Sequence, residues 1–129
     1  MGLIQELHGQ HREIKEHLTK IQKNEDPEVV DNHFKELKTV LISHLINEDN
    51  HLYPVLRSLE ETKQISDSFE EEMGEISTEV MEFYARYEPG EKSESFNHDI
   101  ANIISRLVYR IIQEERVLYP TFKRFFPNK

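Results

Sequence analysis

The chain has 129 residues, of which 32% are charged and only four are glycine, and its formal net charge at pH 7 is -9. This length fits a single domain over residues 1–129, and the composition is typical of a soluble helical protein. The negative charge argues against nucleic acid and anionic membranes as partners, and without cysteine any metal must be held by histidine and carboxylate.

Apolar residues recur at three- and four-residue steps along the whole chain, a spacing that predicts amphipathic helices and no strand. Asp26 and Pro27 suit the start of a helix, Pro54 should kink a helix or end its regular part, and residues 88–90 (Glu-Pro-Gly) indicate a turn. Short connections between long helices predict an all-α, antiparallel up-down-up-down four-helix bundle. The expected helices cover residues 3–23, 27–59, 62–87 and 93–122.

Polar side chains interrupt the apolar stripes that should face the core. Buried imidazoles and carboxylates are costly without partners, so these residues should meet near the middle of the bundle. Two histidines and two glutamates in a dry bundle core are a typical site for iron, manganese or zinc. The inward polar residues are His11, His44, Glu48, His51, Arg110 and Glu114.

One segment occurs twice. HLINEDNHLYP begins at His44 and RIIQEERVLYP begins at Arg110; each has a glutamate four positions after its start. The repeat predicts two equivalent helices in a pseudo-symmetric bundle. The main chemical difference between the two copies is that the histidine at the start of the first is an arginine in the second. His-x-x-x-Glu is metal-ligand spacing on a helix, whereas Arg-x-x-x-Glu is not.

Other residues have simpler interpretations. We interpret the two Leu-Tyr-Pro ends as structural punctuation, and His17, His33 and His98 as solvated side chains. His8, one turn before His11, could orient that histidine or bind the metal itself. His51 is expected at the edge of the core rather than among the ligands.

With an early-helix histidine in QHREIKEHL and the repeated segment, the chain resembles the hemerythrin-like family, also called the HHE cation-binding domain, over essentially its whole length. The resemblance implies a non-haem di-iron centre whose terminal histidines come from all four helices and whose carboxylates bridge the irons. Carried over by position, the metal ligands of this chain are His11, His44, Glu48 and Glu114, with Glu115 as an alternative to Glu114.

The resemblance also identifies what the chain lacks. Met73 and Arg110 stand where the third and fourth helices should supply histidines, and Ser77 stands where some members place another. A thioether is a poor ligand for iron, and a guanidinium does not deprotonate in proteins. A di-iron centre is therefore not expected.

Two interpretations of the core remain open. In the first, His11, His44, Glu48 and Glu114 hold one metal ion, and Arg110 replaces the second cation by bridging the two carboxylates. In the second, the core holds no metal and Arg110 neutralises both glutamates in a structural or signalling module. A catalytic role is a third hypothesis, which would need a substrate pocket that the sequence does not disclose.

The expected partners are a metal ion, with iron as the first candidate, and a small ligand such as dioxygen at an open position of that ion. Nucleic acid and membranes are not expected partners, and no protein partner is identified. No segment has the ~20 apolar residues of a membrane span, and the start of the chain has no signal-peptide pattern, so a cytoplasmic location is expected.

Overall fold

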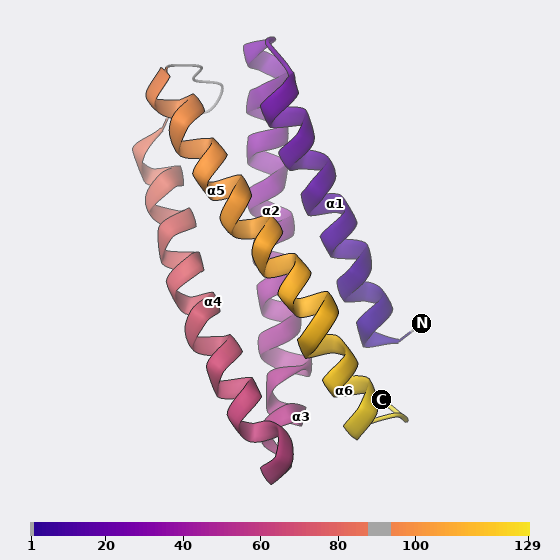
Figure 1. Ribbon diagram of the computed structural model, residues 1–129. Coiled ribbons are helices and arrows are strands. Elements are labelled where there is room, and N and C mark those ends of the chain that lie inside the picture. Colours follow the sequence, from indigo (N-terminus) through magenta and orange to yellow (C-terminus); the bar gives the residue numbers. More distant parts are fainter. Residues whose placement is uncertain (1, 88–93) are drawn as a thin grey trace.

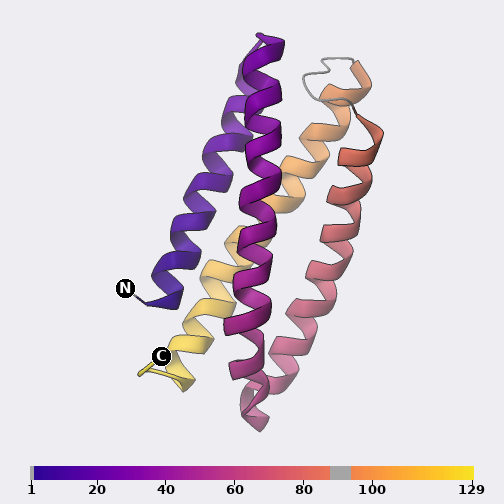
Figure 2. The same ribbon diagram turned by 180° about the vertical axis from the view of Figure 1, so that it is seen from behind.

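The computed structural model of the protein describes residues 2–87 and 94–129. The predicted turn at residues 88–90 and the predicted helix start at residue 93 lie outside these residues. Four long helices run alternately along the molecule, which makes it the predicted all-α, up-down-up-down bundle, and the described part contains no strand (Figures 1 and 2). They are α1 (Leu3–Lys23), α2 (Pro27–His51), α4 (Glu60–Arg86) and α5 (Glu94–Gln113).

The first helix follows its predicted stripe. The residues that the three- and four-residue steps predict to face inward on this helix are all buried on α1. They are Ile4, Leu7, His11, Ile14, Leu18 and Ile21. The next helix starts as expected, since the Asp26 side chain accepts a hydrogen bond from the Glu28 backbone N–H at 3.0 Å and Pro27 lies at the first helical position.

The second predicted helix is in fact two. α2 ends at His51, Leu52 breaks the helix, and α3 (Tyr53–Arg57) follows at the lower end of the bundle in Figure 1. Pro54 lies in the first turn of α3, where its missing N–H removes no intrahelical hydrogen bond. The prediction that His51 faces inward is wrong: His51 is exposed, because the chain turns after it and Leu52 and Tyr53 fill the core instead.

The last predicted helix also has an interruption. α5 continues into a π-helical turn, η1 (Glu114–Leu118), and then into α6 (Tyr119–Phe125). In this turn the Tyr119 backbone N–H reaches the carbonyl of Glu114, five residues earlier. Such single π turns frequently occur at functional sites.

The apolar core has two parts with a polar layer between them. One cluster includes Ile14, Leu41 and Ile111; the other lies around Leu7 and Leu118. On the inward face of α1, His11 lies between Leu7 of one cluster and Ile14 of the other. The buried polar residues therefore meet where the two clusters adjoin.

Candidate metal centre

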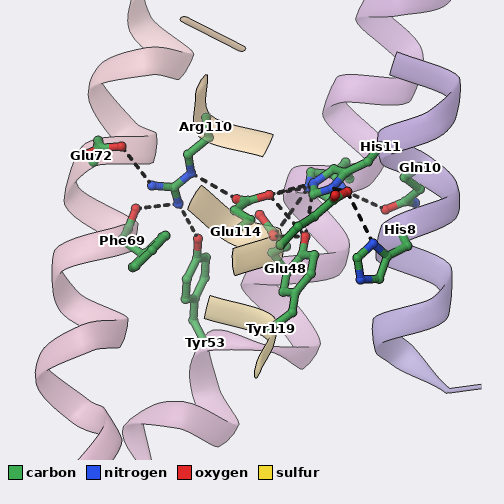
Figure 3. A network of polar contacts seen from close by, with 12 residues as sticks. His8, Gln10, His11, Glu48, Tyr53, Phe69, Glu72, Arg110, Glu114 and Tyr119 are labelled. Carbon is green, nitrogen blue, oxygen red and sulfur yellow. Dashed lines mark hydrogen bonds and ion pairs between the residues drawn. The ribbon is translucent and has the colours of Figure 1, made fainter. Parts of the chain in front are cut away.

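Two imidazoles from neighbouring helices meet in the polar layer. His11 of α1 and His44 of α2 are buried, and their Nε2 atoms are 3.2 Å apart. Glu114 Oε1 lies 2.7 Å from His11 Nε2 and 3.3 Å from His44 Nε2 (Figure 3). Three potential ligand atoms therefore converge on one small region between α1, α2 and η1.

The outer nitrogens of both rings are held by oxygen atoms. His11 Nδ1 is 2.7 Å from Glu115 Oε2, and His44 Nδ1 is 2.9 Å from Gln10 Oε1. Carboxylate and amide oxygens only accept hydrogen bonds, so each Nδ1 is the donor. Each Nε2 then faces Glu114 Oε1: a ring that carries a proton there donates it to this carboxylate, and a neutral ring presents a lone pair, which is how histidine ligands in metal sites are commonly oriented.

Glu48 lies one turn after His44 on α2, beside this group and outside the three atoms that converge. Its Oε2 is 3.4 Å from His44 Nε2 and accepts a hydrogen bond of 2.9 Å from the Tyr119 hydroxyl. Its Oε1 is buried and has no hydrogen-bond partner among residues 2–87 and 94–129. A buried carboxylate oxygen without a partner is costly, and a bound cation is one way to satisfy it.

The π turn separates the roles of two consecutive glutamates. Glu114 is buried and contacts the Nε2 atoms of both histidines, whereas Glu115 contacts the outer nitrogen of His11 and, at 3.3 Å, Nδ1 of His8. The geometry thus places Glu114 among the inward-facing groups and Glu115 behind His11. His8 reaches Glu115 rather than the converging atoms.

Arg110 occupies the other side of Glu114. Its guanidinium is buried and its Nε donates to Glu114 Oε2 at 3.0 Å, while Glu114 Oε1 faces the histidines. Figure 3 shows Glu114 between Arg110 and His11. The expected contact of Arg110 with both core glutamates is only half present, because no hydrogen bond joins it to Glu48. Its other hydrogen bonds go to the Tyr53 hydroxyl, the Phe69 carbonyl and Glu72.

The site favours positive charge between its carboxylates. Burial lowers the pKa of His44, but its contacts with Glu114 and Glu48 outweigh burial and raise the pKa to about 9. Burial also opposes ionisation of Glu114, yet hydrogen bonds from His11 and His44 hold the pKa of this carboxyl well below its usual range. Burial and the nearby charge of Glu114 raise the pKa of Glu48.

A cavity of about 20 Å³ adjoins the histidines, which is room for about one water-sized molecule. Met73 lines it together with His11, His44 and Arg110, so the sequence-based placement of Met73 beside the site agrees with the structure. Ser77 lines a different hollow, between α2 and α4.

The converging atoms are spaced as ligands of one ion would be. Their separations of 2.7 to 3.3 Å fit metal–ligand bonds of about 2.0–2.2 Å, which put neighbouring ligand atoms roughly 2.8–3.5 Å apart. Imidazole nitrogen with carboxylate oxygen suits iron, manganese or zinc. The residues present therefore fit one metal ion, whereas a guanidinium occupies the far side of the bridging carboxylate.

Sequence reasoning missed Gln10, which holds His44 Nδ1, and two tyrosines of the site. The Leu-Tyr-Pro repeats place Tyr53 and Tyr119 inside the core, and each residue is 1% exposed. The Tyr119 hydroxyl contacts Glu48 from the first repeat, and the Tyr53 hydroxyl contacts Arg110 from the second. A tyrosine five positions after each core glutamate was the available signal.

Histidines and carboxylates that converge inside four helices are the donor set found in metal-binding helical bundles. Residues 2–122 match the family model described as the hemerythrin HHE cation-binding domain. The chain therefore belongs to this family of cation-binding domains, as its resemblance predicted. The comparisons with curated proteins and with solved structures returned no match. Among the helices in residues 2–87 and 94–129, none has the length and apolar content needed to cross a membrane.

Proposed function

We propose that this domain binds a single metal ion, non-haem iron or an ion of similar chemistry, through His11, His44, Glu48 and Glu114. The observation that carries the proposal is the orientation of the two imidazoles. Both donate outward through Nδ1 and direct Nε2 toward Glu114 Oε1. Without a cation or added protons, these lone pairs would repel one another and the carboxylate.

The proposed number of ions follows from Arg110. Glu114 presents one oxygen to the histidines and the other to the guanidinium, as a bridging carboxylate does between two cations. Two buried glutamates and one buried arginine leave the layer with one excess negative charge if the imidazoles are neutral. One divalent ion changes this to one excess positive charge, whereas two ions would leave three, a cost that the buried layer cannot offset.

A bound ion of this kind can supply Lewis acidity or redox chemistry to a small ligand. The protein residues hold the ion and limit what can approach it. The adjoining cavity of about 20 Å³ admits only a molecule of water or diatomic size, which supports sensing, storage or small-ligand binding, with dioxygen as one candidate, rather than turnover of a larger substrate.

The alternative is a metal-free structural or signalling module. The buried hydrogen bond between Arg110 Nε and Glu114 Oε2 favours it, because the guanidinium already neutralises one core carboxylate. This alternative leaves Glu48 Oε1 buried with no hydrogen-bond partner in the part of the chain that the structure describes. Failure to bind Fe²⁺, Mn²⁺ and Zn²⁺ in the core after reconstitution would favour it.

The experiment is iron analysis of untagged protein after anaerobic reconstitution with Fe²⁺. The parent is expected to retain one iron per chain and His44→Ala none. His51→Ala is the matched control, because His51 lies on the same helix but is exposed, and it should retain the parent's iron. Equal iron in the parent and in a folded His44→Ala variant would contradict the proposed ligand set.

A further inference from the structure

A second histidine pair lies outside the core site, where the sequence predicted solvated side chains. His17 of α1 and His33 of α2 approach each other with their Nδ1 atoms 2.9 Å apart. Their ring centroids are 5.2 Å apart. Neither side chain is fully exposed, and that of His17 has only 13% of its surface accessible.

The positions of both histidines follow from the α1–α2 hairpin. His17 immediately precedes the buried Leu18, and His33 immediately precedes the buried Phe34. Each histidine therefore lies at the margin of a buried helix face. The two helices run side by side (Figure 2), so these margins face each other across the hairpin. The pairing is thus set by the packing of the core.

A carboxylate lies beside the pair. Glu36 is three residues after His33 on α2, a spacing that puts both on one helix face. Its Oε2 is 3.7 Å from His17 Nε2, and its side chain is 63% exposed and so has room to reorient. One ligand atom from each of His17, His33 and Glu36 lies within 4.8 Å of the other two.

We propose that His17, His33 and Glu36 form a second metal site that takes Zn²⁺ or Cu²⁺, with water completing the coordination. Two bonds of about 2.0–2.1 Å separate their nitrogen atoms by roughly 2.9 Å when they meet near a right angle, as around Cu²⁺, and by roughly 3.3–3.4 Å at the tetrahedral angle of Zn²⁺. The two Nδ1 atoms, 2.9 Å apart, match the first spacing and need to separate by about 0.4 Å for the second. Imidazole favours copper and zinc over Mg²⁺ and Ca²⁺, which prefer oxygen ligands. The bound ion links α1 to α2.

This site is independent of the core centre and of the function proposed for it. His17 follows His11 by six residues, about 9 Å along a helix axis. The second site also shares no residue with the core site. The competing explanation for the short Nδ1–Nδ1 distance is an N–H···N hydrogen bond between two neutral rings.

The test is a titration with Zn²⁺ of three proteins: the parent, His33→Gln and His98→Gln. Calorimetry measures the binding, and NMR monitors the signals of the histidine rings. His98 is an exposed histidine on α5 and serves as the matched control. The expected result is that His33→Gln weakens one Zn²⁺-binding event by at least about 10-fold, since even groups that only orient ligands contribute that much. His98→Gln should bind as the parent does, and the His17 ring signals should shift together with the binding event that His33→Gln weakens.

Circular dichroism confirms folding of each variant, and His17→Gln repeats the test from the other helix. The proposal is overturned if His33→Gln and His17→Gln, both folded, bind Zn²⁺ with the parent's affinity and stoichiometry. It is also overturned if the ring signals of His17 and His33 do not respond to Zn²⁺, which would leave the hydrogen bond as the explanation. A core that binds no metal would not affect either outcome.

Discussion

Replacing Arg110 by methionine tests whether its guanidinium stands in for a second cation. The side chain is 3% exposed and donates to Glu114 at 3.0 Å, to the Tyr53 hydroxyl at 3.0 Å and to the Phe69 carbonyl at 2.9 Å. Its guanidinium lies 4.6 Å from the centre of the Phe69 ring. Methionine would leave the buried Glu114 carboxylate without this charge. Breaking a buried ion pair by removing one partner costs about 3–5 kcal/mol, and we expect that loss of unfolding free energy.

The assay is urea denaturation at pH 7 in the presence of a chelator, since a bound metal would add its own stabilisation. The midpoint should fall by on the order of 2 M urea. Arg106→Met is the matched control: Arg106 also pairs with a carboxylate, Glu79 at 2.9 Å, but its side chain is 41% exposed. That variant should lose less than about 1 kcal/mol. A loss below about 0.5 kcal/mol for Arg110→Met would refute the argument, because only ordinary surface substitutions cost so little.

Three further predictions concern metal binding. In the His33→Gln background, which removes the second proposed site, elemental analysis should give at most one iron per chain; two would contradict the account of Arg110. Glu115→Gln should weaken core metal binding by about 10–100-fold by disturbing the orientation of His11, whereas Glu114→Gln should abolish it, as competition with a chelator can measure. The double variant Met73→His and Arg110→His should bind two irons, because it restores both missing imidazoles; if it folds as a helical bundle and takes up no more iron than the parent, the assignment of these two positions is wrong.

The helices and the inward histidines could be predicted because each depends on local periodicity. His11 continues the stripe of Leu7 and Ile14, and His44 and Glu48 keep four-residue spacing on α2. Residues at this spacing stay on the same face for as long as the helix is regular. His51 shows the limit of the argument, because its prediction assumed that α2 continues beyond the point where it ends.

The tyrosines could not be predicted in this way, because they reach the site through departures from regular helix. Five residues on a regular α-helix rotate a side chain to roughly 140° from the starting face, so Tyr119 should point away from Glu114. The π turn brings them together, with the hydroxyl 3.1 Å from Glu114 Oε1. The same turn lets Glu114 and Glu115 contact different nitrogens of His11, a division of roles that sequence spacing left open.

The pairing of His17 with His33 could not be predicted from the sequence either. Each residue falls at the edge of an apolar stripe, where helical periodicity gives the face only approximately. Whether two such residues meet depends on how α1 and α2 pack, and their Nδ1 atoms end 2.9 Å apart.

The most direct test of the single-metal account is crystallography of Fe²⁺-reconstituted, untagged protein, with anomalous differences measured at the iron absorption edge. The account predicts one peak in the bundle core, within bonding distance of His11 Nε2, His44 Nε2 and Glu114 Oε1, with the Arg110 guanidinium on the far side of Glu114. Two peaks in the core would show a dinuclear centre and contradict the single-metal account. No peak in the core, or one held by His8 and Glu115 instead, would contradict the proposed site.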